Sequence, residues 1–299
     1  SIFAFFPHMI LSCFAIALRA NDPAMGKITK DVLPDQTLLE LLVQNFPDKS
    51  RFQSVSGVFK DMESWDGVTC SGGNETVKQI DFSRDPFDIV ERRDVHGDVS
   101  KGSIDFQWIP SSVESFSISR LQLQGTVETS GLPHGLVTLN IDVNELSGPF
   151  NIAGLPRSLC RVNIDRNMFS GNLQLVHLPP KTRDLLAGRN KFEGNLDLSC
   201  LPETIKSIGL AENSFSGSVD LSRLPRSLRL LRLEGNRISQ KVLTLNTQLK
   251  HFTVSVDERT FETVVDTDGI PAGNIRNRYG VVDVSIYTRT SSDDEGDDF

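Results

Sequence analysis

The residues that most often carry out catalysis are scattered along this 299-residue chain. His96, His134, His177 and His251 share no common spacing. The sequence contains no pair of histidines at metal-binding helical spacing, no serine nucleophile elbow and no glycine-rich phosphate loop. No enzymatic activity is therefore expected, and the sequence predicts no catalytic residue, no metal site and no cofactor.

One polar residue type does recur in register. Leu-Pro or Ile-Pro pairs begin at equal intervals along the chain, at Ile109, Leu132, Leu155, Leu178, Leu201 and Leu224. Counting each start as position 0, position 12 is asparagine in five of the six units: Asn144, Asn167, Asn190, Asn213 and Asn236. A side-chain amide offers two donors and an acceptor, which suits it to backbone groups that a buried turn leaves without partners. We interpret these five residues as a structural asparagine ladder and not as ligand-binding residues.

The constant period of these pairs predicts the fold. It indicates a leucine-rich repeat solenoid, an α/β repeat fold that is right-handed and carries a parallel β-sheet on its concave face. In "LPRSLRLLRLEGN", Leu228, Leu231 and Leu233 are expected to point inward. One unit cannot bury its apolar edge alone, whereas stacked units share a continuous core. Position 14 adds a predicted spine of Phe169, Phe192 and Phe215.

The N-terminal part of the fold is predicted as a cap at 21–72. In "PDQTLLELLVQNF", Leu38, Leu41, Leu42 and Phe46 recur at helical spacing, so a short helix should cover the open end of the core. The solenoid is expected at 73–256, with an insertion at about 86–101. That insertion is either a partner-binding loop or a solvated charged loop.

The C-terminal part is predicted as a shortened last unit, with Leu249, Phe252 and Val254 inward, followed by a β cap at 257–290. In this cap "TFETVV", "DTDG" and "VVDVSIY" indicate strand, turn and strand. "DTDG" could suggest calcium, but the remaining oxygen ligands are missing at loop spacing, which favours a turn. The acidic tail 291–299 is expected to be disordered.

The segment 1–20 is an apolar run that ends at Ala20. It is typical of a secretory signal peptide that lacks its basic start, and a membrane anchor is the alternative. We expect a secreted or cell-surface product without a membrane span, in which "NET" at Asn74 is a glycosylation sequon. The chain has a formal charge of −8, and five of its acids lie in the tail. The rest of the chain is only weakly acidic, whereas a nucleic-acid backbone requires a basic surface. This argues against nucleic acid as a partner. After cleavage Cys70, Cys160 and Cys200 would remain, which is too sparse a set for a disulfide framework.

Several segments resemble a known group of proteins. "ESWDGVTC" with "VKQIDFS", then "GSIDFQWIP", "GNLDLSCLPETI" and "FSGSVDLSRLPRSL", are similar to secreted or surface leucine-rich repeat proteins of kinetoplastid protozoa. More distantly, the chain is similar to the plant extracellular type, whose cap carries a comparable Trp-x-Gly-Val-x-Cys stretch. The resemblance covers about residues 30 to 255. The resemblance implies a non-enzymatic recognition or surface role. Plant-type caps usually pair two cysteines, whereas Cys70 has no second cysteine nearby.

Positions 6, 8 and 10 should line the concave sheet. The early units offer small polar groups there. In the later units Gly188, Gly209 and Ala211 lie between Leu186, Leu230 and Arg232, which predicts a shallow depression with apolar walls and a charged edge. An apolar spot beside arginine is typical of protein contacts. The candidate partner-binding residues are Arg161, Asp184, Leu186, Gly209, Leu230 and Arg232.

Three alternatives to a protein partner remain open. The face could vary neutrally on a passive coat or structural protein, or the chain could be an ectodomain fragment of a larger receptor. A glycan ligand is favoured by the hydroxyls and amides, but Trp65 and Trp108 lie outside the concave positions where an aromatic platform would be needed. The variant Arg232→Glu with Leu230→Asp should abolish partner capture if the recognition hypothesis is right.

The unit that begins at Leu178 has a weak core. Thr182 and Ala187 stand where other units have Leu, Val or Ile. The deficit relative to Leu at a buried site is about 2 to 5 kcal/mol. Local loosening or a change of curvature is expected there, and Ala187→Leu should raise the melting temperature.

Overall fold

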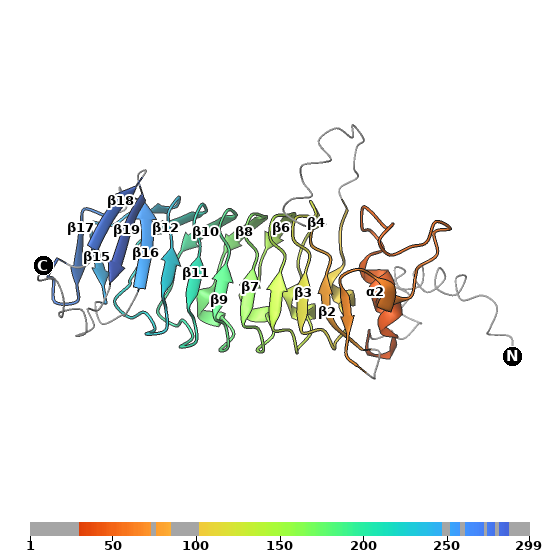
Figure 1. Cartoon of the computed structure of the whole chain (residues 1–299). Coiled ribbons are helices and arrows are strands. Elements are labelled where there is room, and N and C mark those ends of the chain that lie inside the picture. Colours follow the sequence, from red (N-terminus) through yellow and green to blue (C-terminus); the bar gives the residue numbers. More distant parts are fainter. Residues whose placement is uncertain are drawn as a thin grey trace, which may run out of the picture.

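The computed structural model describes residues 30–72, 76–84, 102–246, 252–257, 261–271, 274–278 and 281–286. These residues form an elongated solenoid in which one strand per turn joins a sheet that runs the length of the molecule (Figure 1). The expected signal peptide, Asn74, the insertion at 86–101 and the acidic tail lie outside the described residues.

The long sheet has 11 strands. Eight of them are parallel, one from each turn: β2 (Val77–Asp81), β3 (Ser115–Ser117), β5 (Thr138–Asn140), β7 (Arg161–Asn163), β9 (Asp184–Leu186), β11 (Ser207–Gly209), β13 (Leu230–Arg232) and β16 (Phe252–Asp257). Residues one period apart pair directly, as Leu139 does with Val162. The repeat length read from the sequence is therefore the number of residues in one turn of the solenoid.

The two ends of the long sheet carry antiparallel strands. β1 (Val68–Cys70) pairs with β2 at one end, and β19 (Val281–Ile286) with β18 (Asn274–Arg278) covers β16 at the other. An exposed parallel edge is a template for pairing with other chains, and these strands protect it.

A second parallel sheet lies on the opposite side of the turns, which the sequence pattern did not predict. It consists of β4 (Gln124–Gly125), β6 (Glu145–Pro149), β8 (Met168–Asn172), β10 (Lys191–Asn195), β12 (Ser214–Gly217) and β14 (Arg237–Ile238). Each of its inner strands includes the glycine of position 16, and Gly148 and Gly217 have φ of 83° and 81°. Glycine adopts this left-handed conformation without steric cost, which explains why it recurs.

Single 3₁₀ turns lead from the second sheet back to the next Leu-Pro pair. They are η4 (Phe106–Trp108), η5 (Thr129–Gly131), η6 (Ile152–Gly154) and η7 (Leu175–His177). Asp105, Glu128 and Asn151 each accept a hydrogen bond from the backbone N–H two residues later. A side-chain acceptor at the start of each turn satisfies a donor that the turn leaves free.

The five asparagines form the ladder that the spacing predicts. The Oδ1 atom of Asn213 accepts the Phe192 N–H at 3.1 Å, while its Nδ2 atom donates to the carbonyls of Ala187 and Leu210 at 3.0 and 3.1 Å. The other four asparagines bond the same backbone positions of their own and the preceding unit. Each amide thus ties two consecutive turns together. Beside the ladder, the ring centroids of Phe169, Phe192 and Phe215 stack at 6.3 and 6.2 Å.

The residue before each asparagine has a left-handed backbone. In six consecutive units φ at position 11 lies between 51° and 73°, at Arg120, Val143, Arg166, Arg189, Glu212 and Gly235. Only the last is a glycine, so residue type gave little signal for this conformation. For the β-branched Val143 it is a genuine strain.

The N-terminal helix α2 (Asp35–Leu42) packs against η4 and covers the first turn. Leu38, Leu42 and Phe46 are buried as predicted, but Leu41 is half-buried and Leu39 is buried in its place. The buried face is therefore rotated toward Leu39 by the packing of the helix on the solenoid. Asp35 also accepts the Val77 N–H at 2.9 Å, which connects the helix to β2.

The C-terminal part contains the predicted strand, turn and strand, and its two strands lie in different sheets. β17 (Thr263–Asp266) pairs in parallel with β15 (Val242–Leu245), whereas the strand at 281–286 pairs with β16 and β18. As far as its strand the last unit is not shortened, because Thr253 and Ser255 pair with Leu230 and Arg232, each one full period earlier. Beyond the strand it is shortened, because Thr263 pairs with Val242, which is 21 residues earlier (263 − 242 = 21). Phe252 and Val254 are buried as expected, and Leu249 lies outside the described residues.

The "DTDG" segment is a turn. Oδ1 of Asp266 accepts the N–H groups of Asp268 and Ile270 at 2.9 and 2.8 Å, and Gly269 has φ of 80°. A side chain that bonds backbone two residues ahead is the usual Asx turn.

The unit with Thr182 and Ala187 keeps the pairing of its neighbours. Both residues are fully buried, and β9 pairs in register with β7 and with β11. The smaller side chains therefore cause no break in the sheet.

Candidate functional site

The outward side chains of the long sheet form two columns, which we call the long-sheet face. The first strand residues are Ser115, Thr138, Arg161, Asp184, Ser207, Leu230 and Thr253, and the third are Ser117, Asn140, Asn163, Leu186, Gly209, Arg232 and Ser255. The six candidate residues Arg161, Asp184, Leu186, Gly209, Leu230 and Arg232 thus lie on four adjacent strands, β7 to β13. His251, assigned from sequence to the first column, lies outside the described residues, and the register gives that place to Thr253.

The N-terminal half of the face is a network of small polar groups. The hydroxyl of Ser117 accepts from Nδ2 of Asn140 at 3.2 Å and lies 2.7 Å from the hydroxyl of Ser83. Ser119 donates a short hydrogen bond to Asp142. These groups largely satisfy one another, which makes this half a pre-ordered polar surface.

The middle of the face carries one ion pair. Nε of Arg161 lies 3.6 Å from Oδ2 of Asp184, and the two side chains are 67% and 37% exposed. An exposed pair of this kind stabilises a fold by less than about 1 kcal/mol. Both charges therefore stay available to a partner at little cost.

The C-terminal half of the face is apolar, but it is not the depression that the glycines predicted. Leu186 leans over Gly209, with its Cδ2 atom 3.1 Å from where a Cβ would lie. Asp165 covers Gly188 in the same way, with Oδ1 2.7 Å from the missing Cβ. Leu186 fills the space above Gly209 because burial there removes apolar surface from water. The Asp165 carboxylate is held above Gly188 by accepting its N–H.

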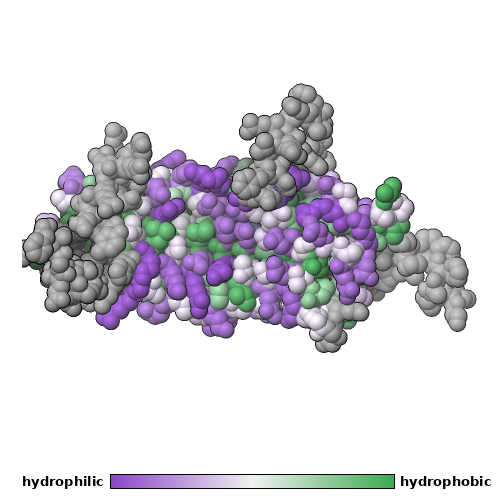
Figure 2. Space-filling view, viewed as in Figure 1, coloured by the Kyte–Doolittle hydropathy of each residue, from purple (hydrophilic) through white to green (hydrophobic). Residues whose placement is uncertain are grey.

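The apolar residues of this half, together with Arg232, form what we call the apolar strip. Leu186 is 37% exposed, and exposed Arg232 lies directly across Gly209 from it. Half-buried Leu230 is on the same strand as Arg232 and lies across Ser207 from Asp184. In the space-filling view, which has the orientation of Figure 1, a band of apolar surface lies between hydrophilic margins (Figure 2). The strip and the ion pair adjoin, because Leu186 and Asp184 are both on β9.

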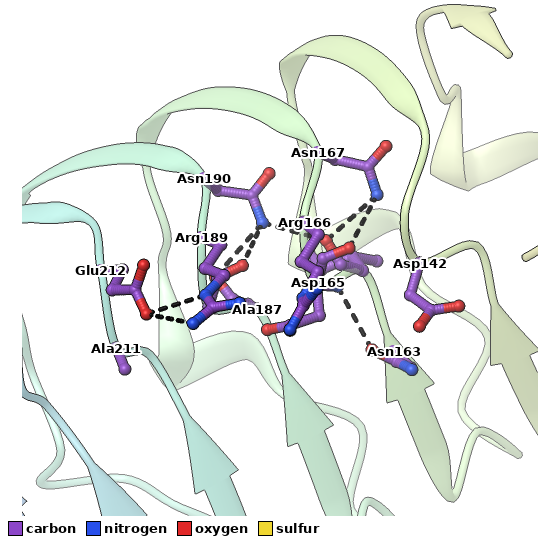
Figure 3. A network of polar contacts seen from close by, with 12 residues as sticks. Asp142, Asn163, Asp165, Arg166, Asn167, Ala187, Arg189, Asn190, Ala211 and Glu212 are labelled. Carbon is purple, nitrogen blue, oxygen red and sulfur yellow. Dashed lines mark hydrogen bonds and ion pairs between the residues drawn. The ribbon is translucent and has the colours of Figure 1, made fainter. Parts of the chain in front are cut away.

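A charged cluster lies just past the C-terminal ends of these strands, and sequence reasoning did not single it out (Figure 3). Nη2 and Nε of Arg189 both lie 2.7 Å from Oε1 of Glu212. Asp165, half-buried between Asp142 and Gly188, has a raised pKa because burial disfavours its charge more than the Gly188 N–H and the nearby arginines favour it. The signal was present in the sequence, since position 10 is acidic in two consecutive units, at Asp142 and Asp165, and position 11 is charged in three, at Arg166, Arg189 and Glu212.

Few groups in the described ranges could do other chemistry. No set of three or more His, Cys, Asp or Glu side chains in that part of the chain is arranged to hold a metal ion. Cys70, Cys160 and Cys200 form no disulfide with one another. Trp65 is buried in the N-terminal part, where its ring stacks on Phe59, so it offers no platform on the face. Among the described helices none is both long and apolar enough to cross a bilayer.

Comparison with known proteins identifies the fold. No protein-family model matches the sequence, and no curated protein matches it. Solved structures do match. The Arabidopsis receptor kinase HAESA in complex with the peptide hormone IDA and the co-receptor SERK1 is 20% identical, with a TM-score of 0.54 over 78% of this chain and 41% of that one.

Two further matches are of the same kind. The HAESA leucine-rich repeat ectodomain with an N-terminally extended IDA peptide is 21% identical, with a TM-score of 0.52 over 78% and 41% of the two chains. A pollen receptor kinase 3 is 22% identical, with a TM-score of 0.43 over 57% and 79%. The chain spans well under half of the HAESA ectodomain. At these identities the matches show the fold alone, which is a leucine-rich repeat solenoid.

Proposed function

We propose that the long-sheet face binds a protein partner through an extended segment laid across strands β7 to β13. The observation that carries this proposal is the exposed Leu186 with exposed Arg232 across Gly209, and half-buried Leu230 on the same strand as Arg232. The Arg161–Asp184 pair adjoins them, because Asp184 shares β9 with Leu186. An apolar strip bordered by arginine supplies both desolvated area and directional hydrogen bonds. The solenoid of HAESA, which shares this fold, was crystallised with a peptide hormone.

The proposal includes a secreted or cell-surface location without enzymatic activity. It is supported by the apolar run at residues 1–20 and by the resemblance to surface repeat proteins of kinetoplastid protozoa. In that location Asn74 would be a glycosylation site, which peptide mapping of the protein recovered from culture medium would test.

A matched pair of variants tests the binding face. The face variant combines Leu186→Asp with Arg232→Glu. The control variant combines Val176→Asp with Arg237→Glu, because Val176 is also 37% exposed and Arg237 is an exposed arginine, and both lie off the long sheet.

The probes are 12-residue peptides selected from a display library on the wild-type protein. We expect the face variant to weaken their binding at least 30-fold, measured as Kd by fluorescence anisotropy, and the control variant to change it less than 3-fold. Peptides that bind the face variant as tightly as wild type would contradict the proposal.

The main rival is a passive coat or structural protein. It is favoured by the way Leu186 and Asp165 fill the space above Gly209 and Gly188. Under this alternative the library yields no peptide that distinguishes the two variants. Glycan binding is the second rival, and a glycan array probed with both variants would reveal it as sugar binding lost only in the face variant. If the chain is an ectodomain fragment of a larger receptor, the binding face would be the same.

A further inference from the structure

A column of cations lies along the edge of the long sheet where the strands begin. The Lys206 N–H donates to the Arg183 carbonyl at 2.7 Å, and the Arg229 N–H donates to the Lys206 carbonyl at 2.8 Å. These three residues therefore follow one another at about the strand spacing, ~4.8 Å. All three are exposed.

More cations lie beside this column. Arg157, Lys181 and Arg226 are exposed in the loops that lead into β7, β9 and β13. We call these six residues the basic rim: Arg157, Lys181, Arg183, Lys206, Arg226 and Arg229.

Few acidic residues accompany the basic rim. In these four units, from the Leu-Pro start to the first strand residue, the acids are Glu203 and Asp184, and Asp184 pairs with Arg161. No ion pair among the described residues involves a cation of the basic rim. Stacked like charges repel one another, so the rim favours an anionic segment.

The chain leaves the long sheet at this same edge. β19 runs antiparallel to β16, so Ile286 pairs with Phe252 at the start of β16, and the Thr253 N–H donates to the Arg229 carbonyl at 2.8 Å. Figure 1 shows β16 and β19 side by side at this end of the sheet. Ile286 is two strand spacings from Arg229 and four from Arg183, or about 10 and 19 Å.

The residues that follow β19 are strongly acidic. Asp293, Asp294, Glu295, Asp297 and Asp298 come after a six-residue connection, 287–292. A connection of that length spans up to about 20 Å when extended. The acids can therefore reach every cation from Arg229 back to Arg183.

We propose that the acidic stretch 293–298 docks on the basic rim of its own chain. The covalent link provides a high effective concentration, so weak pairs suffice. Exposed ion pairs are screened by salt, so the docking is reversible and is lost as ionic strength rises. The docked stretch lies beside the long-sheet face and covers cations that an acidic partner would otherwise use.

Zero-length carbodiimide crosslinking tests this docking, because it joins a lysine amine to a carboxylate only when the two touch. At 20 mM salt we expect Lys206 and Lys181 to crosslink to the acidic stretch, at least fivefold more than at 500 mM salt. Lys191 is the control, since it is exposed on β10 of the second sheet. A mixture of ¹⁴N- and ¹⁵N-labelled protein should give crosslinks within single chains.

Two variants distinguish the effect of the basic rim on crosslinking from the effect of the total charge of the protein. Arg183→Ser with Arg229→Ser keeps Lys206 as the reporter and should lower its crosslink yield at least threefold. Arg166→Ser with Arg237→Ser removes the same charge elsewhere and should leave the yield unchanged, with circular dichroism confirming that both variants fold.

Three outcomes would overturn the proposal. The crosslink yield of Lys206 could be no higher than that of Lys191, or it could be the same at both salt concentrations and in the rim variant. The crosslinks could also form mainly between differently labelled chains. A chain that ends at residue 290 should also bind heparin more tightly than the full chain. Equal heparin affinity would show that the rim is open to polyanions and not covered by the acidic stretch.

Discussion

At the scale of single residues, polar groups with fixed backbone partners stabilise this fold more than charged pairs do. Asn213 is 9% exposed and bonds backbone groups of two units, whereas the Arg161–Asp184 pair is open to water. Leaving a buried polar group without a hydrogen bond costs more folding free energy than an exposed ion pair contributes.

The ladder can be tested by removing one amide. Asn213→Ala leaves the Phe192 N–H without its partner and removes one of the two amide donors from each of the Ala187 and Leu210 carbonyls. We therefore expect a loss of about 2 to 3 kcal/mol in the free energy of unfolding, measured with urea. Asn163→Ala on the long-sheet face, where Oδ1 accepts the Asp165 N–H, should cost less than about 1 kcal/mol. Equal losses would refute the ladder.

The backbone strain at position 11 can be reduced by substituting Val143. Val143 has φ of 54°, and Asn tolerates this region far better than a β-branched residue. Val143→Asn should therefore stabilise the protein by about 1 kcal/mol, seen as a higher thermal midpoint. Gly235→Val at the same position of a later unit should lower the midpoint, since its Cβ would lie 3.1 Å from Glu212. A lower midpoint for Val143→Asn would count against strain at this site.

The raised pKa of Asp165 predicts a pH dependence. A carboxyl whose pKa is higher in the folded state stabilises the fold below its unfolded pKa, and that stability is lost as pH rises through the folded value. Asp165→Asn should therefore be more stable than wild type at pH 7, with the difference vanishing below about pH 4.

Asp220 provides a control of opposite sign. Hydrogen bonds from Ser222 lower its pKa, so it stabilises the fold above its unfolded pKa and that stability is lost on acidification. Asp220→Asn should be less stable than wild type at pH 7. Parallel pH profiles for the two variants would show that the charges do not act as described.

At the scale of one turn of the solenoid, each repeated position has one structural task, so a departure at one position has a local cost. Thr182 is fully buried where the next unit has Ile205, and its hydroxyl reaches only the Leu159 carbonyl, at 3.5 Å. That distance is at the limit of a hydrogen bond.

Replacing this hydroxyl by a methyl group should stabilise the turn. We expect Thr182→Val to increase the free energy of unfolding by about 1 kcal/mol, because a poorly satisfied buried hydroxyl is removed. The reciprocal change Ile205→Thr should cost about 1 to 3 kcal/mol. A destabilised Thr182→Val protein in urea titration would mean that the hydroxyl makes a better bond than its geometry indicates.

At the scale of the whole molecule, antiparallel strands cover both end strands of the parallel part of the long sheet. β19 pairs with β16 along its whole length, from Phe252–Ile286 to Asp257–Val281, and so covers the last parallel strand. Without it β16 would present an unpaired edge.

Two truncations test this role. A chain that ends at residue 271 lacks β18 and β19, and we expect its mass in light scattering to at least double through edge pairing. A chain that ends at residue 286 keeps both strands and should remain monomeric. A monomeric chain ending at 271 would show that the edge needs no cover.

The sequence by itself determined the period, the parallel sheet, the inward positions and the asparagine ladder. It could do so because each of these features repeats once per turn and depends on contacts between equivalent positions, as when Asn190 bonds the backbone of its own and the preceding turn. The candidate face was likewise predictable as a set of positions, since side chains alternate along a strand.

Only the tertiary structure determined the features that do not repeat along the chain, namely the strand pairing at its C-terminal end and the shape of the long-sheet face. The pairing of β17 with β15 and of β19 with β16 depends on how the last turns pack, which no local pattern encodes. The space above Gly188 and Gly209 is filled by Asp165 and Leu186 of the preceding turns, so the shape of the face depends on side chains one full repeat away. Burial and edge pairing act between turns and not within them, which is why the chain's ends and its surface relief had to be read from the folded molecule.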